Sequence, residues 1–249
     1  RYTPPPHTGL AILHKDDALL VLNKPSGLLS VAGRGADKQD CLTLRVQAEY
    51  PQAMNVHRLD MDTSGIMVMA RDRSVHRQLS RLFQAREVHK HYVAVVDGRM
   101  QQSAGEIVFP LTADWPNRPR QKVDYQNGKP STTRFSVMHH DARENTTRVD
   151  LAPETGRTHQ LRIHLQTLGH AILGDTLYAG QAVREKADRL LLHATSLSFR
   201  HPLSGEQLCF GDLQIGSGAI HLFLPRVPLL PQGDQLLQSL SAHLEFPFG

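Results

Sequence analysis

The sequence predicts an α+β fold with a mixed, mostly antiparallel central sheet that is flanked by helices and loops. Short apolar runs rich in β-branched residues recur along the chain, only a few segments have helical spacing, and no internal repeat is present. Strands and helices that do not alternate regularly favour such a sheet over a parallel one. The length of 249 residues suits one large domain or two small ones.

The first expected elements are a hairpin and a helix. Residues 1–9 are polar and rich in proline, so we expect an irregular lead-in segment there. The apolar runs at 10–13 and 19–22 are separated by a polar turn, which predicts a β-hairpin. Asp40 stands where an N-cap would begin a helix over about residues 41–50.

A strand, a tight polar turn and a second strand are expected between residues 54 and 70, with Asp60 in the turn. Such a turn holds a carboxylate rigidly, as an enzyme requires that uses aspartate as a nucleophile or as a charge stabiliser. Asp72 then precedes a predicted helix whose apolar residues include Val75 and Leu79.

The rest of the chain predicts more strands and one further long helix. The β-branched run at 92–96 predicts a strand, and residues 158–168 have the leucine spacing of a helix. Residues 114–122 form a polar, basic loop with the only tryptophan, and residues 212–249 form a C-terminal extension without an assigned role. Other strands are expected at 107–111, 135–138, 148–151, 190–192 and 197–199, and a short amphipathic helix at 236–244.

Composition narrows the class of protein. Hydrophobic residues make up 40% and charged residues 21%, which is ordinary for a globular protein. No apolar run approaches the roughly 20 residues of a membrane span, and no signal peptide is visible, so we expect a cytoplasmic protein. Two cysteines are too few for a disulfide framework or a zinc site. The net charge of +4 suits a polyanionic partner.

Several short motifs occur in a fixed order between about residues 15 and 210. The turn with Asp60 reads H-R-L-D-M-D-T-S-G over residues 57–65. The others are K-P-S-G at 24–27, K-H-Y at 90–92, T-G-R-T-H-Q-L-R-I-H at 155–164, G-D at 174–175 and L-H-A at 192–194. Together these motifs resemble those of the RluA-type pseudouridine synthases.

The resemblance implies isomerisation of uridine to pseudouridine within RNA, without a cofactor. The N1–C1′ glycosidic bond breaks, the uracil turns over, and C5 bonds to C1′. Asp60 would act as a carboxylate on the ribose, on the base, or by helping to form a glycal. Arg162 lies between two apolar residues, and a buried arginine needs an anionic partner. The resemblance makes Asp60 that partner, and it makes Tyr92 the third catalytic residue, which stacks on the base and could help to remove the C5 proton.

The resemblance also implies that the target uridine is flipped out of the RNA, with Arg58 filling the vacated space. Loop nucleotides cost least to extrude. The resemblance makes a 23S rRNA hairpin loop, a tRNA anticodon stem-loop, or both, the expected partner. The loop at 115–119 is similar to that of a member of the family with this dual specificity. Substrate contacts are expected from His57, Arg58, Thr63, Leu161, Lys24, Trp115, Arg118 and Arg120. The catalytic domain would span residues 10–211, and the protein is expected to be a monomer.

Other interpretations involve a metal or the loss of catalysis. The Asp60 turn satisfies the opening of a calcium-binding loop, but the twelfth position is Arg71 instead of glutamate. His159 and His164 are five residues apart, unlike the helical zinc pair with four, so we expect no metal. A non-catalytic RNA-binding module of the same fold and a metal-dependent hydrolase are the alternatives, and the intact motifs argue against the first.

Overall fold

The computed structural model describes residues 2–215 and 218–225, and its main feature is a large mixed sheet. Neighbouring strands follow the order β1-β2-β4-β11-β5-β10-β9-β6, with β3 beside β4, β12 beside β11 and β13 beside β12. The predicted α+β class is confirmed, and so is the mostly antiparallel sheet. Among the described strands, the parallel neighbours are β4 and β11.

The elements have the following bounds. The strands of the large sheet are β1 Ile12–Lys15, β2 Leu19–Lys24, β3 Met54–Asn55, β4 Ser64–Ala70, β5 His89–Asp97, β6 Ala104–Val108, β9 Thr132–Asp141, β10 Thr146–Pro153, β11 Leu192–Arg200, β12 Gln207–Ile215 and β13 Gly218–Pro225. A separate two-stranded sheet pairs β7 Leu111–Ala113 with β8 Gln121–Val123. The α-helices are α1 Leu42–Glu49, α2 Arg73–Ala85, α3 Gln160–Thr167 and α4 Gln181–Arg184, and the 3-10 helices are η1 Ala36–Lys38 and η2 Trp115–Asn117.

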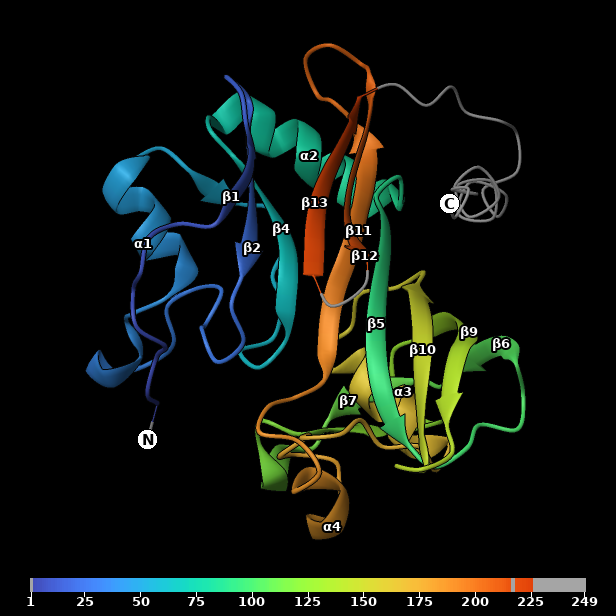
Figure 1. Cartoon of the computed structure of the whole chain (residues 1–249). Helices are drawn as coiled ribbons and strands as arrows, with labels where there is room; N and C mark the ends of the chain where they lie inside the picture. Colours follow the sequence, from blue (N-terminus) through green and yellow to red (C-terminus); the bar gives the residue numbers. More distant parts are fainter. Residues whose placement is uncertain (1, 216–217, 226–249) are drawn as a thin grey trace, which may run out of the picture.

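The sheet has two halves that meet at β11. In Figure 1, β1, β2 and β4 lie on one side of β11 with α1, and β5, β10, β9 and β6 lie on the other with α3. Helix α2 contributes to the core formed with residues of β2, β4 and β11. β4 is buried along its whole length, because its alternate residues pack into two different cores. A third core fills the other half between the sheet and α3.

Gly65 allows the two halves to come together. Its φ is 116°, a region that other residues rarely adopt, and it follows the Asp60 turn at the start of β4. A Cβ atom at this position would lie 2.3 Å from the carbonyl oxygen of Ala194 in β11. The glycine of the T-S-G motif therefore fixes the turn against the centre of the sheet.

Most of the local predictions hold. The hairpin is β1–β2, the strands on either side of the Asp60 turn are β3 and β4, and Asp72 caps α2 by accepting hydrogen bonds from two backbone N–H groups. The prediction for Asp40 was wrong: Cys41 is the N-cap of α1, and the Asp40 carboxylate pairs instead with Arg45 at 2.8 Å. The lead-in has no regular secondary structure in residues 2–11, yet the Tyr2 hydroxyl binds the Asp40 carbonyl oxygen at 2.9 Å.

Other strands differ from expectation. The run at 107–111 is divided between β6 and β7 at Pro110, since proline has no N–H for the strand ladder. The two short strands expected at 190–192 and 197–199 are the single strand β11, with a register shift between Ala194 and Ser196. Residue 211 falls inside β12, and the helix expected at 236–244 lies outside the described residues. Within residues 2–215 and 218–225, no helix combines the length and apolar character that crossing a membrane requires.

Candidate active site

Lys24 anchors the Asp60 turn from inside the protein. Its side chain is fully buried, and its Nζ donates to the carbonyl oxygens of Pro25, Leu28 and Met61 at 2.9, 2.6 and 2.9 Å. All three ammonium protons therefore have acceptors. We expected Lys24 to touch the substrate, but its burial and its bonds instead give it the role of fixing the turn.

Further hydrogen bonds fasten the same two segments to each other. The Ser26 hydroxyl donates to the Asp62 carbonyl oxygen at 2.6 Å, and the Gly27 N–H donates to the Met61 carbonyl oxygen at 2.9 Å. The Ser30 hydroxyl donates to the Leu59 carbonyl oxygen at 2.6 Å. The K-P-S-G motif is thus a clamp that holds the backbone around Asp60 in one conformation.

The buried ammonium of Lys24 should make stability depend on pH. Burial lowers the pKa of Lys24 from 10.5 to about 7, and the carboxylates of Asp62 and Asp60 oppose this shift. Between these values the unfolded chain binds the additional proton, so the free energy of unfolding should rise with pH by up to about 1.4 kcal/mol per unit. We expect Lys24→Met to lose this contribution when urea denaturation is measured at pH 7, 8 and 9.

The test compares how steeply the free energy of unfolding changes with pH in the two proteins, and not how stable each protein is. Methionine leaves the carbonyl oxygens of Pro25 and Leu28 without this donor, while Met61 keeps the N–H of Gly27, so Lys24→Met will be less stable at every pH. Burial also lowers the pKa of Lys90, which adds a similar slope to both proteins. Lys38→Met, at an exposed lysine, is the control. Equal slopes in wild type and Lys24→Met would contradict the prediction.

Two side chains from the start of α3 approach the Asp60 carboxylate. The Nη1 of Arg162 and the Nε2 of His159 each lie 4.0 Å from Oδ2 of Asp60. The side chain of Asp60 is 24% exposed, whereas that of Arg162 is 2% exposed. A carboxylate that solvent can reach is therefore faced from the interior by a fixed guanidinium.

The principal partner of Arg162 is Asp175, which corrects our expectation that it would be Asp60. The Nε and Nη2 of Arg162 donate to the two carboxylate oxygens of Asp175 at 2.8 and 2.6 Å, a bidentate geometry. Burial raises the pKa of Asp175, but the hydrogen bonds and charge of Arg162 act against this, and the net shift is downward. A guanidinium this deeply buried needs a buried anion, and Asp175 leaves its third nitrogen directed at Asp60.

Tyr92 lies where the two halves of the sheet meet. It stands on β5 opposite Ala194 of β11 and Leu151 of β10, and it packs against the cores of both halves. Leu161 is buried in one of these cores. Burial raises the pKa of Tyr92, and the Asp60 charge raises it further, so its hydroxyl keeps its proton at neutral pH.

The residues on either side of Asp60 point in different directions. The Nε2 of His57 accepts the N–H of Val68 at 3.0 Å, its ring stacks on Phe83, and burial lowers its pKa to about 3. Thr63 is buried. We expected both to bind substrate, but these contacts direct them into the fold. Arg58 is exposed.

The basic loop at 114–122 is joined to the site through Tyr178. The guanidinium of Arg118 lies 3.6 Å from the centre of the Trp115 ring, and this ring belongs to a residue that is 67% exposed. Arg120 lies over the Tyr178 ring at 5.5 Å, and the Gln121 N–H donates to the Tyr178 hydroxyl at 2.8 Å. The loop is not irregular throughout, because it contains η2 and the start of β8.

Sequence reasoning missed four residues of the site. Asp62, Asp175 and Tyr178 were given no role, and His159 was considered only as a metal ligand. Burial raises the pKa of Asp62, and Arg162 and Lys24 oppose the shift. For Asp175, the G-D motif at residues 174–175 could have indicated a role in the site. No sequence signal placed Tyr178 beside a loop almost 60 residues earlier in the chain.

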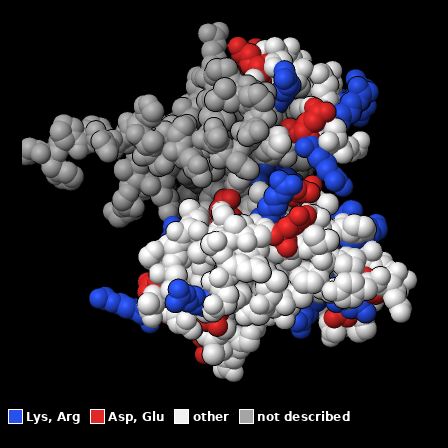
Figure 2. All heavy atoms as spheres, turned by 90° about the vertical axis from the view of Figure 1, so that its right-hand side faces the viewer, with Lys and Arg blue, Asp and Glu red and all other residues white. Residues whose placement is uncertain are grey.

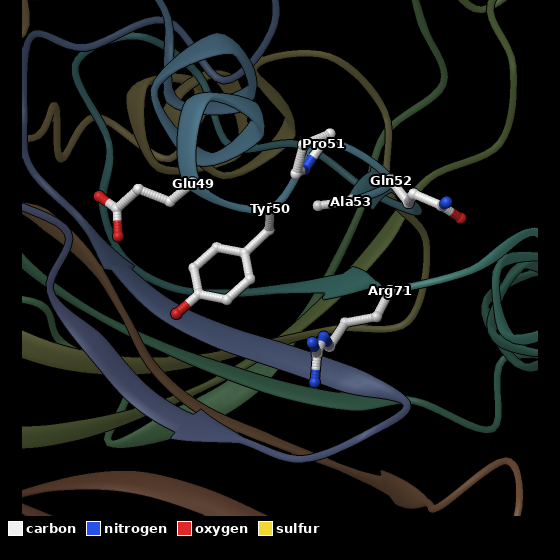
Figure 3. Close-up of a pocket in the computed structure, with 6 residues that line it drawn as sticks. All are labelled: Glu49, Tyr50, Pro51, Gln52, Ala53 and Arg71. Atoms are coloured by element: carbon white, nitrogen blue, oxygen red, sulfur yellow. The ribbon is translucent and has the colours of Figure 1, made fainter.

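Three other features of the described residues do not indicate a function. In the described part of the chain, no group of three or more His, Cys, Asp or Glu side chains is arranged to hold a metal ion. A cavity of about 250 Å³ is lined by Glu49, Tyr50, Pro51, Gln52, Ala53 and Arg71, and Asp60 is not among its lining residues (Figure 3). Figure 2 shows basic and acidic side chains side by side on the face at the β6 side, so the described residues form no continuous basic stripe there.

Comparisons with known proteins agree with this geometry. The family model described as RNA pseudouridylate synthase matches residues 18–167. The dual-specificity RNA pseudouridine synthase RluA of Escherichia coli is 50% identical over 209 residues, which cover 84% of this chain and 95% of that protein. RluA of Vibrio parahaemolyticus is 50% identical over 206 residues, 82% of each chain. The structure of human RNA Pseudouridylate Synthase Domain Containing 1 matches with a TM-score of 0.69 and 27% identity, covering 96% of this chain and 98% of that one.

Proposed function

The chain belongs to the RNA pseudouridylate synthase family, and we propose the residues with which it converts uridine to pseudouridine in RNA. Asp60 is the residue that acts on the substrate. The observation that carries this assignment is the position of its carboxylate, which is partly exposed, held by a clamped turn, and faced at 4.0 Å by Arg162. An activated carboxylate needs this combination of access and rigidity.

The other two catalytic residues act around this carboxylate. Arg162 presents positive charge to Asp60 from a position that Asp175 fixes. Tyr92 provides an aromatic surface against which the uracil stacks. Because burial raises its pKa, the phenol stays neutral at pH 7 and is a poor general base. Leu161 belongs to the core against which Tyr92 packs, and it completes the apolar side of the base pocket.

The substrate uridine is flipped out of its RNA to reach Asp60. A stacked base hides its glycosidic bond, so enzymes of this kind act on extruded or unpaired nucleotides. Arg58 is exposed two residues before Asp60, and its planar guanidinium can stack and donate hydrogen bonds in the vacated space. The supporting observation is that its neighbours His57 and Leu59 are directed into the fold.

The RNA is a 23S rRNA hairpin loop, a tRNA anticodon stem-loop, or both. The relatives with about 50% identity are named dual-specificity enzymes, and the W-P-N-R-P loop is present here. We further propose that the protein acts as a monomer in the cytoplasm and uses neither a metal nor a cofactor.

Release of tritium from RNA labelled at uracil C5 tests the function directly, because this hydrogen is lost when C5 bonds to C1′. We expect one tritium to be released for each uridine converted, by purified protein without added nucleotide or metal. Binding of RNA without release would favour the non-catalytic RNA-binding module. Mapping pseudouridines in cells that lack the protein would identify the target.

We expect the double variant Arg118→Ala and Arg120→Ala to bind substrate RNA more weakly and with a flatter salt dependence. Each phosphate contact to a single-stranded region contributes about 0.7 to the slope of log K against log salt concentration, so loss of two contacts should lower the slope by about 1.4. The measurement is filter retention of a stem-loop RNA at several salt concentrations.

The matched control replaces two exposed arginines elsewhere on the surface. Arg99 and Arg143 are both exposed near the far end of β5, where the Gly98 N–H bonds to the Asn145 carbonyl oxygen. Their double alanine variant should retain the wild-type slope. An unchanged slope after loss of Arg118 and Arg120 would exclude these two as phosphate contacts.

A further inference from the structure

Tyr178 connects the basic loop to the active site by hydrogen bonds. Its hydroxyl accepts the N–H of Gln121 at 2.8 Å and lies 2.7 Å from Nδ1 of His159. The ring of Tyr178 also lies under the guanidinium of Arg162, at 5.2 Å. The opposite nitrogen of His159, Nε2, faces Oδ2 of Asp60 at 4.0 Å. A continuous chain of groups therefore runs from the loop backbone to the catalytic carboxylate.

The hydrogen-bond partners of Tyr178 determine which nitrogen of His159 carries the proton. Among the described residues, the Tyr178 hydroxyl has two partners, the Gln121 N–H and His159 Nδ1. The backbone N–H can only donate, so the buried phenol proton needs His159 Nδ1 as its acceptor. Burial lowers the pKa of His159 and raises that of Tyr178, so both are neutral at pH 7. Nε2 of His159 then carries the hydrogen that points at Asp60.

The backbone holds His159 firmly in this position. It is the N-cap residue of α3 and has a φ of 54°, a left-handed conformation that costs energy in a residue other than glycine. Its ring meets that of Tyr178 edge to face, with centroids 5.6 Å apart. The side chain makes no capping hydrogen bond, so the start of α3 does not itself require a histidine at this position.

We propose that His159 is a positioning residue for Asp60, and that Tyr178 holds it in the tautomer with hydrogen on Nε2. This proposal rests on the function proposed above for Asp60. The distance of 4.0 Å is longer than a hydrogen bond, and such contacts in free enzymes tighten when the substrate binds. Contact between Nε2–H and Oδ2 would orient Asp60 toward the flipped nucleotide.

The tautomer is measured on the free protein, without an activity assay. We expect two-dimensional NMR of protein labelled with ¹⁵N-histidine to show His159 at pH 7 as neutral, with hydrogen on Nε2. Its signal is identified by its absence in His159→Gln. In Tyr178→Phe, the signal should move toward a mixture of tautomers. A wild-type His159 that is charged, or that carries hydrogen on Nδ1, would overturn the proposal even if the enzyme is active.

The kinetic test separates positioning from a purely structural role. The phenol stabilises the neutral imidazole, so Tyr178→Phe should raise the pKa of His159. His159 also faces the charges of Asp60, Arg162, Asp175 and Asp62. Once protonated, it would form an ion pair with Asp60, which makes the carboxylate a weaker nucleophile. We expect the single-turnover rate of Tyr178→Phe to fall about fivefold more than that of wild type between pH 8 and pH 6.

Two further variants complete the design. Adding His159→Gln to Tyr178→Phe should remove the additional pH dependence, because no titrating group remains at that position. Tyr50→Phe, on the side of the molecule with the cavity, is the control and should retain the wild-type profile. A Tyr178→Phe profile parallel to that of wild type would show that Tyr178 only supports the fold. Absence of tritium release from wild type would instead count against the proposed function, and the NMR result would stand by itself.

Discussion

Replacement of Asp60 by asparagine is expected to abolish turnover while RNA binding stays close to that of wild type. The amide has the shape of the carboxylate but no negative charge, so it cannot act as the nucleophile or stabilise a cation. We expect the rate of tritium release in a single turnover to fall at least about a thousandfold, which corresponds to roughly 4 kcal/mol of activation free energy. Filter retention of the same RNA measures binding separately.

The structure explains why this variant should still fold. Arg162 lies 4.0 Å from Asp60 but makes its two short hydrogen bonds to Asp175, so its guanidinium keeps a buried partner when Asp60 is neutralised. The clamp by Lys24 binds the Met61 carbonyl oxygen of the turn and does not involve the Asp60 side chain. The midpoint of urea denaturation should therefore change little.

Asp62→Asn is the matched control, because it makes the same change two residues further along the same turn. Burial raises the pKa of Asp62. We expect its rate to fall by less than about tenfold. Rates near that of wild type in Asp60→Asn, or equal losses in the two variants, would refute the assignment of Asp60.

The features that the sequence predicts well depend on residues close together in the chain. The β1–β2 hairpin follows from two apolar runs and a polar turn, and the α2 cap follows from Asp72 and the N–H groups two and three residues later. The same holds for the Asp60 turn, whose strands are separated by the turn alone. Local hydrogen bonds and side-chain period determine these elements.

The partners of charged residues were harder to predict, because they depend on distant segments. A lysine in a turn of this kind suggests a contact to an anionic substrate. In the structure, the Lys24 ammonium also binds the Met61 carbonyl oxygen, 37 residues away, and lies in the interior. For Arg162, the sequence indicated burial and a need for an anion, yet several carboxylates could satisfy that need. Asp175 does so because its loop also supplies the N–H groups of Leu177 and Tyr178 to the same carboxylate. The motifs pointed to the segments that form the candidate site but not to these contacts.

Removal of Arg162 should affect both stability and catalysis, and Asp175 is the reason for the loss of stability. Arg162→Ala leaves the Asp175 carboxylate buried without its counterion, which typically costs about 3–5 kcal/mol. Asp175→Asn keeps Arg162 but weakens its bidentate hold, so the guanidinium can turn toward Asp60. We expect this variant to bind RNA and to release tritium about tenfold or more slowly.

A double-mutant cycle separates the pair from its surroundings. Because Arg162→Ala and Asp175→Ala each leave an unpaired charge, their effects on the free energy of unfolding should add up to more than the effect of the double variant, by about 1–3 kcal/mol. The control cycle uses Lys186 and Asp97, an ion pair at 2.6 Å in which both side chains are about one-third exposed. Solvent screens such a pair, so its coupling should stay below about 1 kcal/mol. Similar coupling energies in the two cycles would mean that the buried pair is not what holds Arg162 in the active site.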